Sequence, residues 1–143
     1  MFMRHYFLDT NVVIDYLAQR QPFWPDAAEL MQAGLAGEAR LYVSSLSFTN
    51  IEYIMRRASS AQQAWQLLWK LEPLVEIVTV DATVIRQAIV AHFSDFEDGV
   101  QYFAAQNTPL ISGIITRDPK GFSGSTIPVI SPAQALIELD SAV

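Results

Sequence analysis

Short apolar runs rich in β-branched and aromatic residues alternate along the chain with segments whose apolar residues recur every three or four positions. The first pattern predicts strands and the second predicts helices. We expect strands over 3–8, 41–43, 75–80, 110–115 and 127–130. Helices are expected just after Asp9 and over 26–35, 47–57, 61–71, 82–92, 95–106 and 132–139. Strands that alternate with helices predict an α/β fold with a parallel sheet covered on both faces.

The amino-acid composition excludes several classes of protein and of functional site. The 143 residues are expected to form a single domain over 1–143, and with 51% hydrophobic residues they can build a full core. The absence of cysteine excludes disulfides, thiolate zinc sites and cysteine nucleophiles. Neither a signal peptide nor an apolar stretch of about 20 residues is visible, so a cytoplasmic protein without a membrane span is expected. The net charge of −6 argues against broad phosphate-driven nucleic-acid binding, though not against a metal-dependent nuclease.

Acidic residues stand where the predicted strands end and where one helix begins. Asp9 closes the apolar run 6–8, Asp118 follows the run 114–116, and Asp95 and Asp98 open the helix 95–106. Each alone could be structural, because Asp9 and Asp95 could cap helices and Asp118 could be a turn residue. Ligands in parallel sheets bind at the carboxyl ends of strands, and carboxylates are the oxygen ligands that hard cations prefer. Together the four predict a divalent-metal site, whereas Glu97 should point elsewhere on its helix.

Three ordered segments, 7–13, 95–102 and 115–122, resemble the motifs of the PIN-domain family, which includes the VapC-type toxins. The resemblance extends over nearly the whole chain. It implies a three-layer α/β/α sandwich with a central parallel sheet. It also implies that Asp9, Asp98 and Asp118 bind Mg²⁺ or Mn²⁺, with Asp95 close behind, for hydrolysis of RNA. A bound ion would activate water and stabilise charge on the phosphate. On this basis the expected function is a metal-dependent ribonuclease, the toxin of a toxin–antitoxin pair.

One position departs from the family pattern. The family usually places a glutamate on the helix after the second strand, and the matching residue here is Asn50. Glu52 lies two residues later, about 200° around the helix, so both cannot face one site. We expect Asn50 to be the fourth site residue, as in a branch of the family with the Asp-Phe-Glu-Asp signature. Glu52 is then expected on a solvated face, paired with Arg56.

Several further residues have two interpretations. Thr10 and Asn11 beside Asp9, and Thr116 near Asp118, could cap helices or bind a metal-bound water. Arg117 could contact phosphate or lie on the surface. Trp24, Trp65 and Trp69 could stack on bases. Core or interface positions are the favoured interpretation for these tryptophans.

The expected partners are an RNA substrate, a second copy of the chain and a small antitoxin-like protein. Two alternatives remain open. A catalytically weak PIN-like module that binds RNA or protein is suggested by the neutral Asn50. A receiver-like magnesium-binding signalling domain would need a central phosphoacceptor aspartate and a lysine at the end of a late strand, and neither is evident. The sequence does not identify the RNA or an antitoxin.

Overall fold

A computed structural model describes residues 3–141 of the chain. Within that range five parallel strands form one sheet, in the order β3-β2-β1-β4-β5. The strands are β1 (Arg4–Leu8), β2 (Ala39–Ser44), β3 (Glu76–Val78), β4 (Gly113–Ile115) and β5 (Val129–Ile130). The chain builds the sheet outward from β1 in one direction through β2 and β3, then returns to the other side of β1 for β4 and β5.

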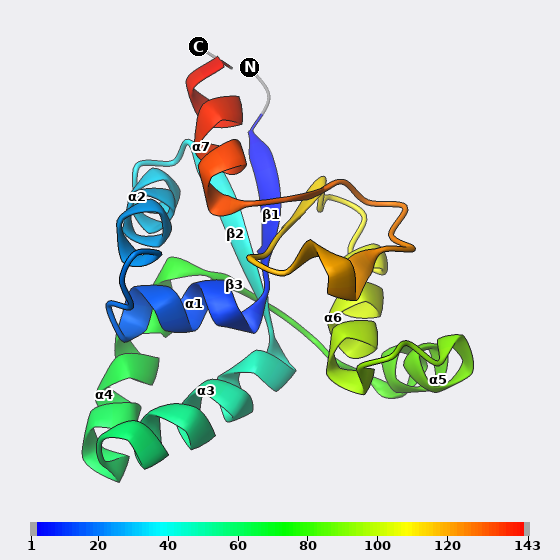
Figure 1. Cartoon of the computed structure of the whole chain (residues 1–143), viewed down its shortest axis with the longest axis horizontal. Coiled ribbons are helices and arrows are strands. Elements are labelled where there is room, and N and C mark those ends of the chain that lie inside the picture. Colours follow the sequence, from blue (N-terminus) through cyan, green and yellow to red (C-terminus); the bar gives the residue numbers. More distant parts are fainter. Residues whose placement is uncertain (1–2, 142–143) are drawn as a thin grey trace.

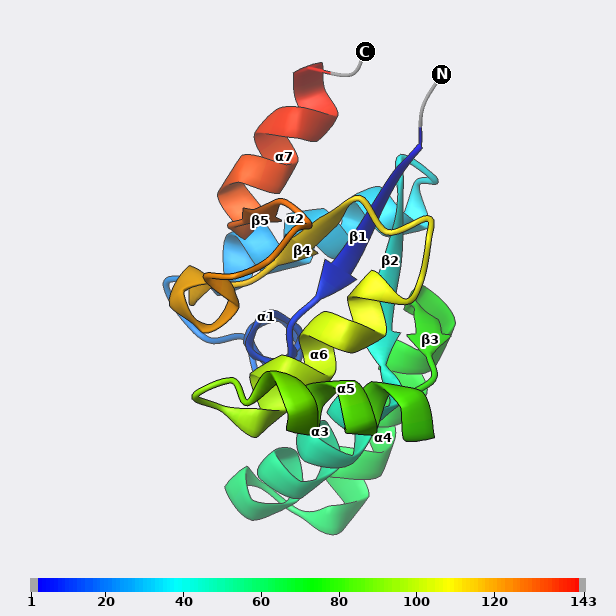
Figure 2. The same cartoon turned by 90° about the vertical axis from the view of Figure 1, so that its right-hand side faces the viewer.

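Helices cover both faces of the sheet, as predicted, and the result is an α/β/α sandwich (Figure 1). One side carries α1 (Thr10–Leu17), α2 (Trp24–Leu35), α3 (Ser45–Ala58), α4 (Ala61–Leu71) and α7 (Pro132–Ser141). The other side carries α5 (Ala82–Ala91) and α6 (Phe96–Gln106), which pack together (Figure 2). Two short 3₁₀ turns, η1 (Glu72–Leu74) and η2 (Pro119–Phe122), complete the fold. No helix in this part of the chain is long and apolar enough to cross a bilayer.

Side chains of β1 alternate between the two layers. Tyr6 and Leu8 belong to the core beneath α1 and α2, whereas Phe7 belongs to the core beneath α6. All three are fully buried, and burying a side chain of this size contributes about 1.5–3 kcal/mol. The second half of the central strand, Tyr6 to Leu8, is therefore apolar on both faces because it faces a core on each side, whereas Arg4 and His5 begin the strand and are only partly buried.

Four of the five strands are shorter than the segments that predicted them, whereas β2 extends beyond 41–43 to Ala39–Ser44. The run 110–115 yields only Gly113–Ile115 as β4, because the Ile111 N–H donates to the Thr108 carbonyl at 3.1 Å and closes a turn there. The run 75–80 yields only Glu76–Val78 as β3. Apolar residues beyond the ladder still pack on the core, so hydrophobicity alone overestimates strand length.

The topology brings two distant segments together at one edge of the sheet. Leu8 pairs with Ile115 in the β1–β4 register, so Asp9 and Thr116 leave their strands side by side. The Asp9 N–H extends the ladder by donating to the Ile115 carbonyl at 2.9 Å. The connections reverse direction between β1 and β4, and such switch points are where open α/β sheets bind ligands.

Candidate metal centre

Asp9 is the most buried acid of the group at the switch point. Its backbone is extended and caps α1, and its Oδ1 accepts a hydrogen bond from the Thr10 N–H at 2.8 Å. Its Oδ2 accepts from the Thr116 hydroxyl at 2.8 Å. Burial raises the pKa of Asp9, and the charges of Asp118 and Asp95 raise it further, against the lowering effect of the two hydrogen bonds. The capping interpretation is therefore correct, and it leaves a buried carboxylate facing other acids.

The start of α6 supplies the next acids. Asp95 is the N-cap, and its Oδ1 accepts from the Asp98 N–H at 3.1 Å. This cap places Glu97 and Asp98 in the first turn. Burial raises the pKa of Asp98 to about 6, with further contributions from Asp9, Asp95, Glu97 and Asp118. Such a shift reflects a carboxylate crowded by like charges.

Asp118 joins the group through the loop that follows β4. Its N–H donates to the Thr116 Oγ1 at 3.0 Å, and the same hydroxyl donates to Asp9, so Thr116 connects the two acids. The turn η2 then brings Gly121 against the Asp98 carboxylate, where a side chain on Gly121 would collide with it. The absence of a Cβ at Gly121 is what allows this approach.

Asn50 lies on the side of α3 that faces these acids. Its Nδ2 donates to the Glu97 Oε2 at 2.8 Å. Glu52 instead pairs with Arg56, with 2.9 Å between its Oε2 and the arginine Nε. The expectation that Glu97 points elsewhere is wrong: burial raises its pKa, and so do the charges of Asp9 and Asp95. We call Asp9, Asp95, Glu97, Asp98 and Asp118 the acidic cluster.

A buried amide side chain on α6 donates a hydrogen bond to the Thr10 hydroxyl. Gln101 is fully buried on α6, and its Nε2 donates to the Thr10 Oγ1 at 3.0 Å and to the Ser47 Oγ at 2.7 Å. Asn11 reaches Thr116, with 3.5 Å between its Nδ2 and the Oγ1. The Gln101 Oε1 and the Asn11 Oδ1 are buried without a partner in the part of the chain that is described. Sequence reasoning missed Gln101, although an amide among the buried residues of α6 is a recognisable signal.

Arg117 is exposed, as the surface interpretation predicts, and it also pairs with a buried acid. Its Nε donates to the Oδ2 of Asp15 at 2.5 Å and its Nη2 to the Oδ1 at 3.2 Å, which forms a bidentate pair. Asp15 is 1% exposed, and the guanidinium also lies 3.9 Å from the centre of the Phe23 ring. Arg117 therefore compensates a buried charge on α1 and stacks on an aromatic ring.

The chemistry of the acidic cluster fits a hard divalent cation. Within residues 3–141, the ion pairs are Arg40–Glu76, Arg56–Glu52 and Arg117–Asp15, and none compensates the cluster. Carboxylates raised in pKa by one another would be stabilised by a cation with oxygen ligands. The described range contains no group of three or more acidic or histidine side chains already placed to hold a metal ion. That Asp9, Asp98 and Asp118 share one metal ion stays a prediction.

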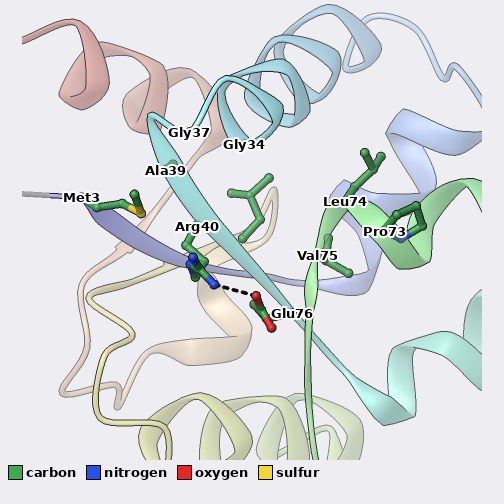
Figure 3. A pocket seen from close by; sticks show the side chains of 10 residues that line it. Met3, Gly34, Gly37, Ala39, Arg40, Pro73, Leu74, Val75 and Glu76 are labelled. Atoms are coloured by element: carbon green, nitrogen blue, oxygen red, sulfur yellow. Dashed lines mark hydrogen bonds and ion pairs between the residues drawn. The ribbon is translucent and has the colours of Figure 1, made fainter.

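A separate pocket at the other end of the strands has no part in this group. It encloses about 200 Å³ and is lined by residues of β2, β3 and the preceding turns (Figure 3). Its charged side chains, Arg40 and Glu76, point toward each other and pair at 2.6 Å (Figure 3). Because the two charges neutralise each other and no acid of the cluster lines this pocket, it is not a candidate for the same chemistry.

Solved structures with the same fold are numerous, and several come from toxin–antitoxin complexes. A DNA-bound VapBC from Salmonella typhimurium aligns with a TM-score of 0.70 at 15% identity, covering 91% of this chain and 99% of that one. A toxin–antitoxin complex from Klebsiella pneumoniae gives 0.65 at 18% identity, with 89% and 97% covered. A sarcin-ricin loop cleaving VapC toxin from Mycobacterium tuberculosis gives 0.64 at 16% identity, with 83% and 94% covered. At these identities the likeness concerns the fold.

The sequence itself carries the family assignment. No curated protein matches the chain. The PIN domain family matches residues 5–120, a span that runs from β1 through β4 and includes every acid of the cluster. The chain belongs to the PIN domain family.

Proposed function

We propose that the protein is a Mg²⁺- or Mn²⁺-dependent endoribonuclease and the toxin of a toxin–antitoxin pair. The observation that carries this proposal is the acidic cluster. Five carboxylates lie near one another at a topological switch point, close enough to raise the pKa values of Asp9, Glu97 and Asp98, and no base in the described range pairs with them. PIN domains are usually nucleases, and a solved relative of this fold cleaves the sarcin-ricin loop.

Each side chain of the site has a proposed role. Asp9, Asp98 and Asp118 would hold the metal, with Asp95 close behind. A bound divalent ion supplies an activated water and stabilises charge on the scissile phosphate. Thr116 orients Asp9 and Asp118 through its two hydrogen bonds, and Thr10 holds the Asp9 carboxylate through its N–H. Asn11 acts on the same hydroxyl of Thr116.

Asn50 and Glu97 together replace the glutamate usual in the family. Asn50 brings no charge, and its amide holds Glu97 beside the other acids. The negative charge lost on α3 is thus supplied by α6. We propose that Asn50 acts by positioning Glu97 as well as by binding a metal-bound water.

An exposed apolar groove supports the proposed partners. Trp65 and Trp69 are 61% and 74% exposed, and with Phe48, Leu68 and Ile77 they line a groove of about 430 Å³. Exposed apolar patches of this kind mark interaction surfaces. We propose that a second copy of the chain covers this groove, and that a small antitoxin-like protein binds the dimer. Structures of this fold from Klebsiella pneumoniae and Salmonella typhimurium come from such complexes.

The test is cleavage of single-stranded RNA by purified protein with Mg²⁺ or Mn²⁺. Wild-type protein should cleave, whereas Asp9→Asn and a chelator should each reduce cleavage by orders of magnitude without unfolding the chain. Unchanged cleavage by Asp9→Asn would reject the mechanism. RNA binding without cleavage would favour the weak-turnover binding module, and phosphoryl transfer to the protein would favour the receiver-like alternative.

A further inference from the structure

A second cavity adjoins the acidic cluster and is unused by the proposed chemistry. It encloses about 490 Å³ between α6 and the loop around η2, and Asp95 and Asp98 form one side of it. Phe93, Tyr102, Phe103, Gln106, Lys120 and Gly124 also line it. Small-molecule sites have volumes of roughly 300–1,000 Å³, so the cavity can take a ligand the size of one nucleotide.

Three aromatic rings form a continuous wall of this cavity. The Phe93 and Tyr102 rings stack with their centres 5.7 Å apart, and the Phe103 ring meets Tyr102 edge-on at 5.0 Å. The Tyr102 hydroxyl is fixed by Thr126 and by the Gln106 amide, each at 3.1 Å. Phe93 and Phe103 remain only partly buried although they pack against the core. Proteins that bind single-stranded nucleic acids stack bases on aromatic rings of this kind.

One residue that lines the cavity carries a positive charge. Lys120 follows Asp118 by two residues, is exposed, and forms no ion pair with any residue in 3–141. The chain has only one other lysine, Lys70, which lies over the Tyr16 ring on the α1–α4 side. A lysine and aromatic rings that line one cavity beside the acidic cluster offer a contact for a phosphate and for a base, the two groups that alternate along a nucleic-acid strand.

We infer that this cavity binds one unpaired nucleotide of the RNA, next to the phosphate that is cleaved. The inference rests on the proposed function and adds that the RNA substrate must offer an unpaired nucleotide next to the cleaved phosphate. The base lies against the Phe93 and Phe103 rings, and its phosphate contacts Lys120. A base in a duplex stays stacked on its neighbours and cannot enter such a cavity. The protein therefore selects loops and single strands over duplexes.

The experiment measures RNA binding without turnover. Fluorescence anisotropy follows a short labelled single-stranded RNA with protein carrying Asp9→Asn, in the presence of Mg²⁺. Gly124→Phe adds a ring at the lining of the cavity, and because nothing lies within 4 Å of a Cβ placed on Gly124 the change causes no clash there. It should weaken binding roughly tenfold, which is the effect of losing one stacked base. Ala36→Phe adds the same ring on an exposed position outside the cavity and should not change the affinity.

A second pair of variants serves if Gly124→Phe does not fold. Lys120→Gln should weaken binding and lower the slope of log affinity against log salt by about 0.7, whereas Lys70→Gln should leave the slope unchanged. Equal affinities of the Gly124→Phe and Ala36→Phe variants, equal salt slopes of the two lysine variants, or equal binding of a duplex would each overturn the inference. If the cavity binds a peptide and not a nucleotide, Gly124→Phe and Ala36→Phe should bind the RNA with equal affinity. Failure of wild-type protein to cleave RNA would reject the proposed activity and leave the binding result standing.

Discussion

Asn50 on α3 donates a 2.8 Å hydrogen bond to Glu97 on α6, and this contact joins the residue at which the resemblance leads one to expect a glutamate to a carboxylate of the acidic cluster. A neutral amide and a carboxylate from different helices thus occupy one corner of the acidic cluster. In the proposed metal site Glu97 would supply the negative charge that Asn50 lacks, so substitutions at Asn50 test both the orientation of this residue on α3 and the proposed chemistry.

Asn50→Glu should tighten Mn²⁺ binding and destabilise the metal-free protein. The added carboxylate meets Glu97 at close range, which costs roughly a kcal/mol without a cation and is recovered when one binds. Titration calorimetry measures the affinity, and urea unfolding in chelator measures the stability. Glu52→Gln is the matched control, because Glu52 pairs with Arg56 and should matter to neither. Loss of metal binding in Glu52→Gln, with Asn50→Glu neutral, would contradict this assignment.

Asp98 should make the metal-free protein less stable as pH rises. Its pKa is about 6 in the folded chain against an ordinary value of 3.8, so the folded state binds the proton more tightly than the unfolded state. The stability this adds is fully present below about pH 3.8 and is lost as pH rises through about 6.

Asp98→Asn should therefore raise the stability at pH 7.5 in chelator by about 1 kcal/mol, allowing for solvent screening. Urea unfolding across pH measures this, and Glu29→Gln, on the exposed side of α2, is the control. An equal pH dependence in wild type and Asp98→Asn would show that the charge of Asp98 is compensated.

Arg117→Ala should destabilise the fold by about 3 kcal/mol, because it leaves the Asp15 carboxylate buried without its guanidinium. Arg117→Lys should recover only part of the loss, since an ammonium can neither bond both oxygens in the same way nor stack on Phe23. The free energy of unfolding in urea is the measurement. Lys120→Ala, three residues on and exposed, should stay within about 0.5 kcal/mol of wild type. A similarly small change for Arg117→Ala would mean that water replaces the pair.

Gly121→Ala should weaken Mn²⁺ binding roughly tenfold while leaving the fold stable within about 0.5 kcal/mol. The new methyl displaces the Asp98 carboxylate, which is the free end of a side chain and can rotate away at little cost. Calorimetry in a double-mutant cycle isolates the effect, since Gly121→Ala should add no further loss in an Asp98→Asn background. If Gly121→Ala weakened Mn²⁺ binding just as much in the Asp98→Asn background, its effect would come from a change in the loop and not from displacement of the Asp98 carboxylate.

Trp69→Glu should convert the proposed dimer into a monomer, because a charge in the groove of Trp65 and Trp69 would be buried at the interface. Light scattering at high micromolar concentration measures the mass. Val90→Glu, at an apolar position on α5 that is also exposed, should leave the dimer intact. A monomeric wild-type protein would remove the dimer from the proposal.

Local patterns sufficed for the architecture and for most of the acidic cluster. Strand and helix periodicity gave the α/β sandwich, and strand ends located Asp9 and Asp118, because parallel strands bring their carboxyl ends together. Contacts between residues that are far apart in the sequence could not be predicted from these local patterns. Glu97 lies in the first turn of α6, which begins after the Asp95 N-cap, and there its side chain accepts a hydrogen bond from Asn50 of α3. Arg117 and Asp15 are 102 residues apart, and no periodicity relates them.

The hydrogen bond from Thr116 to Asp9 joins residues 107 positions apart, so the acidic cluster depends on the last third of the chain. During synthesis β1, β2 and β3 can pair as soon as they emerge, but Asp9 then lacks both Thr116 and Asp118. The cluster is assembled only when β4 docks against β1 and the loop with Gly121 closes on Asp98. A growing or truncated chain that ends before β4 therefore carries a partly formed sheet and no complete site. The timing of chain completion thus determines when any activity can begin.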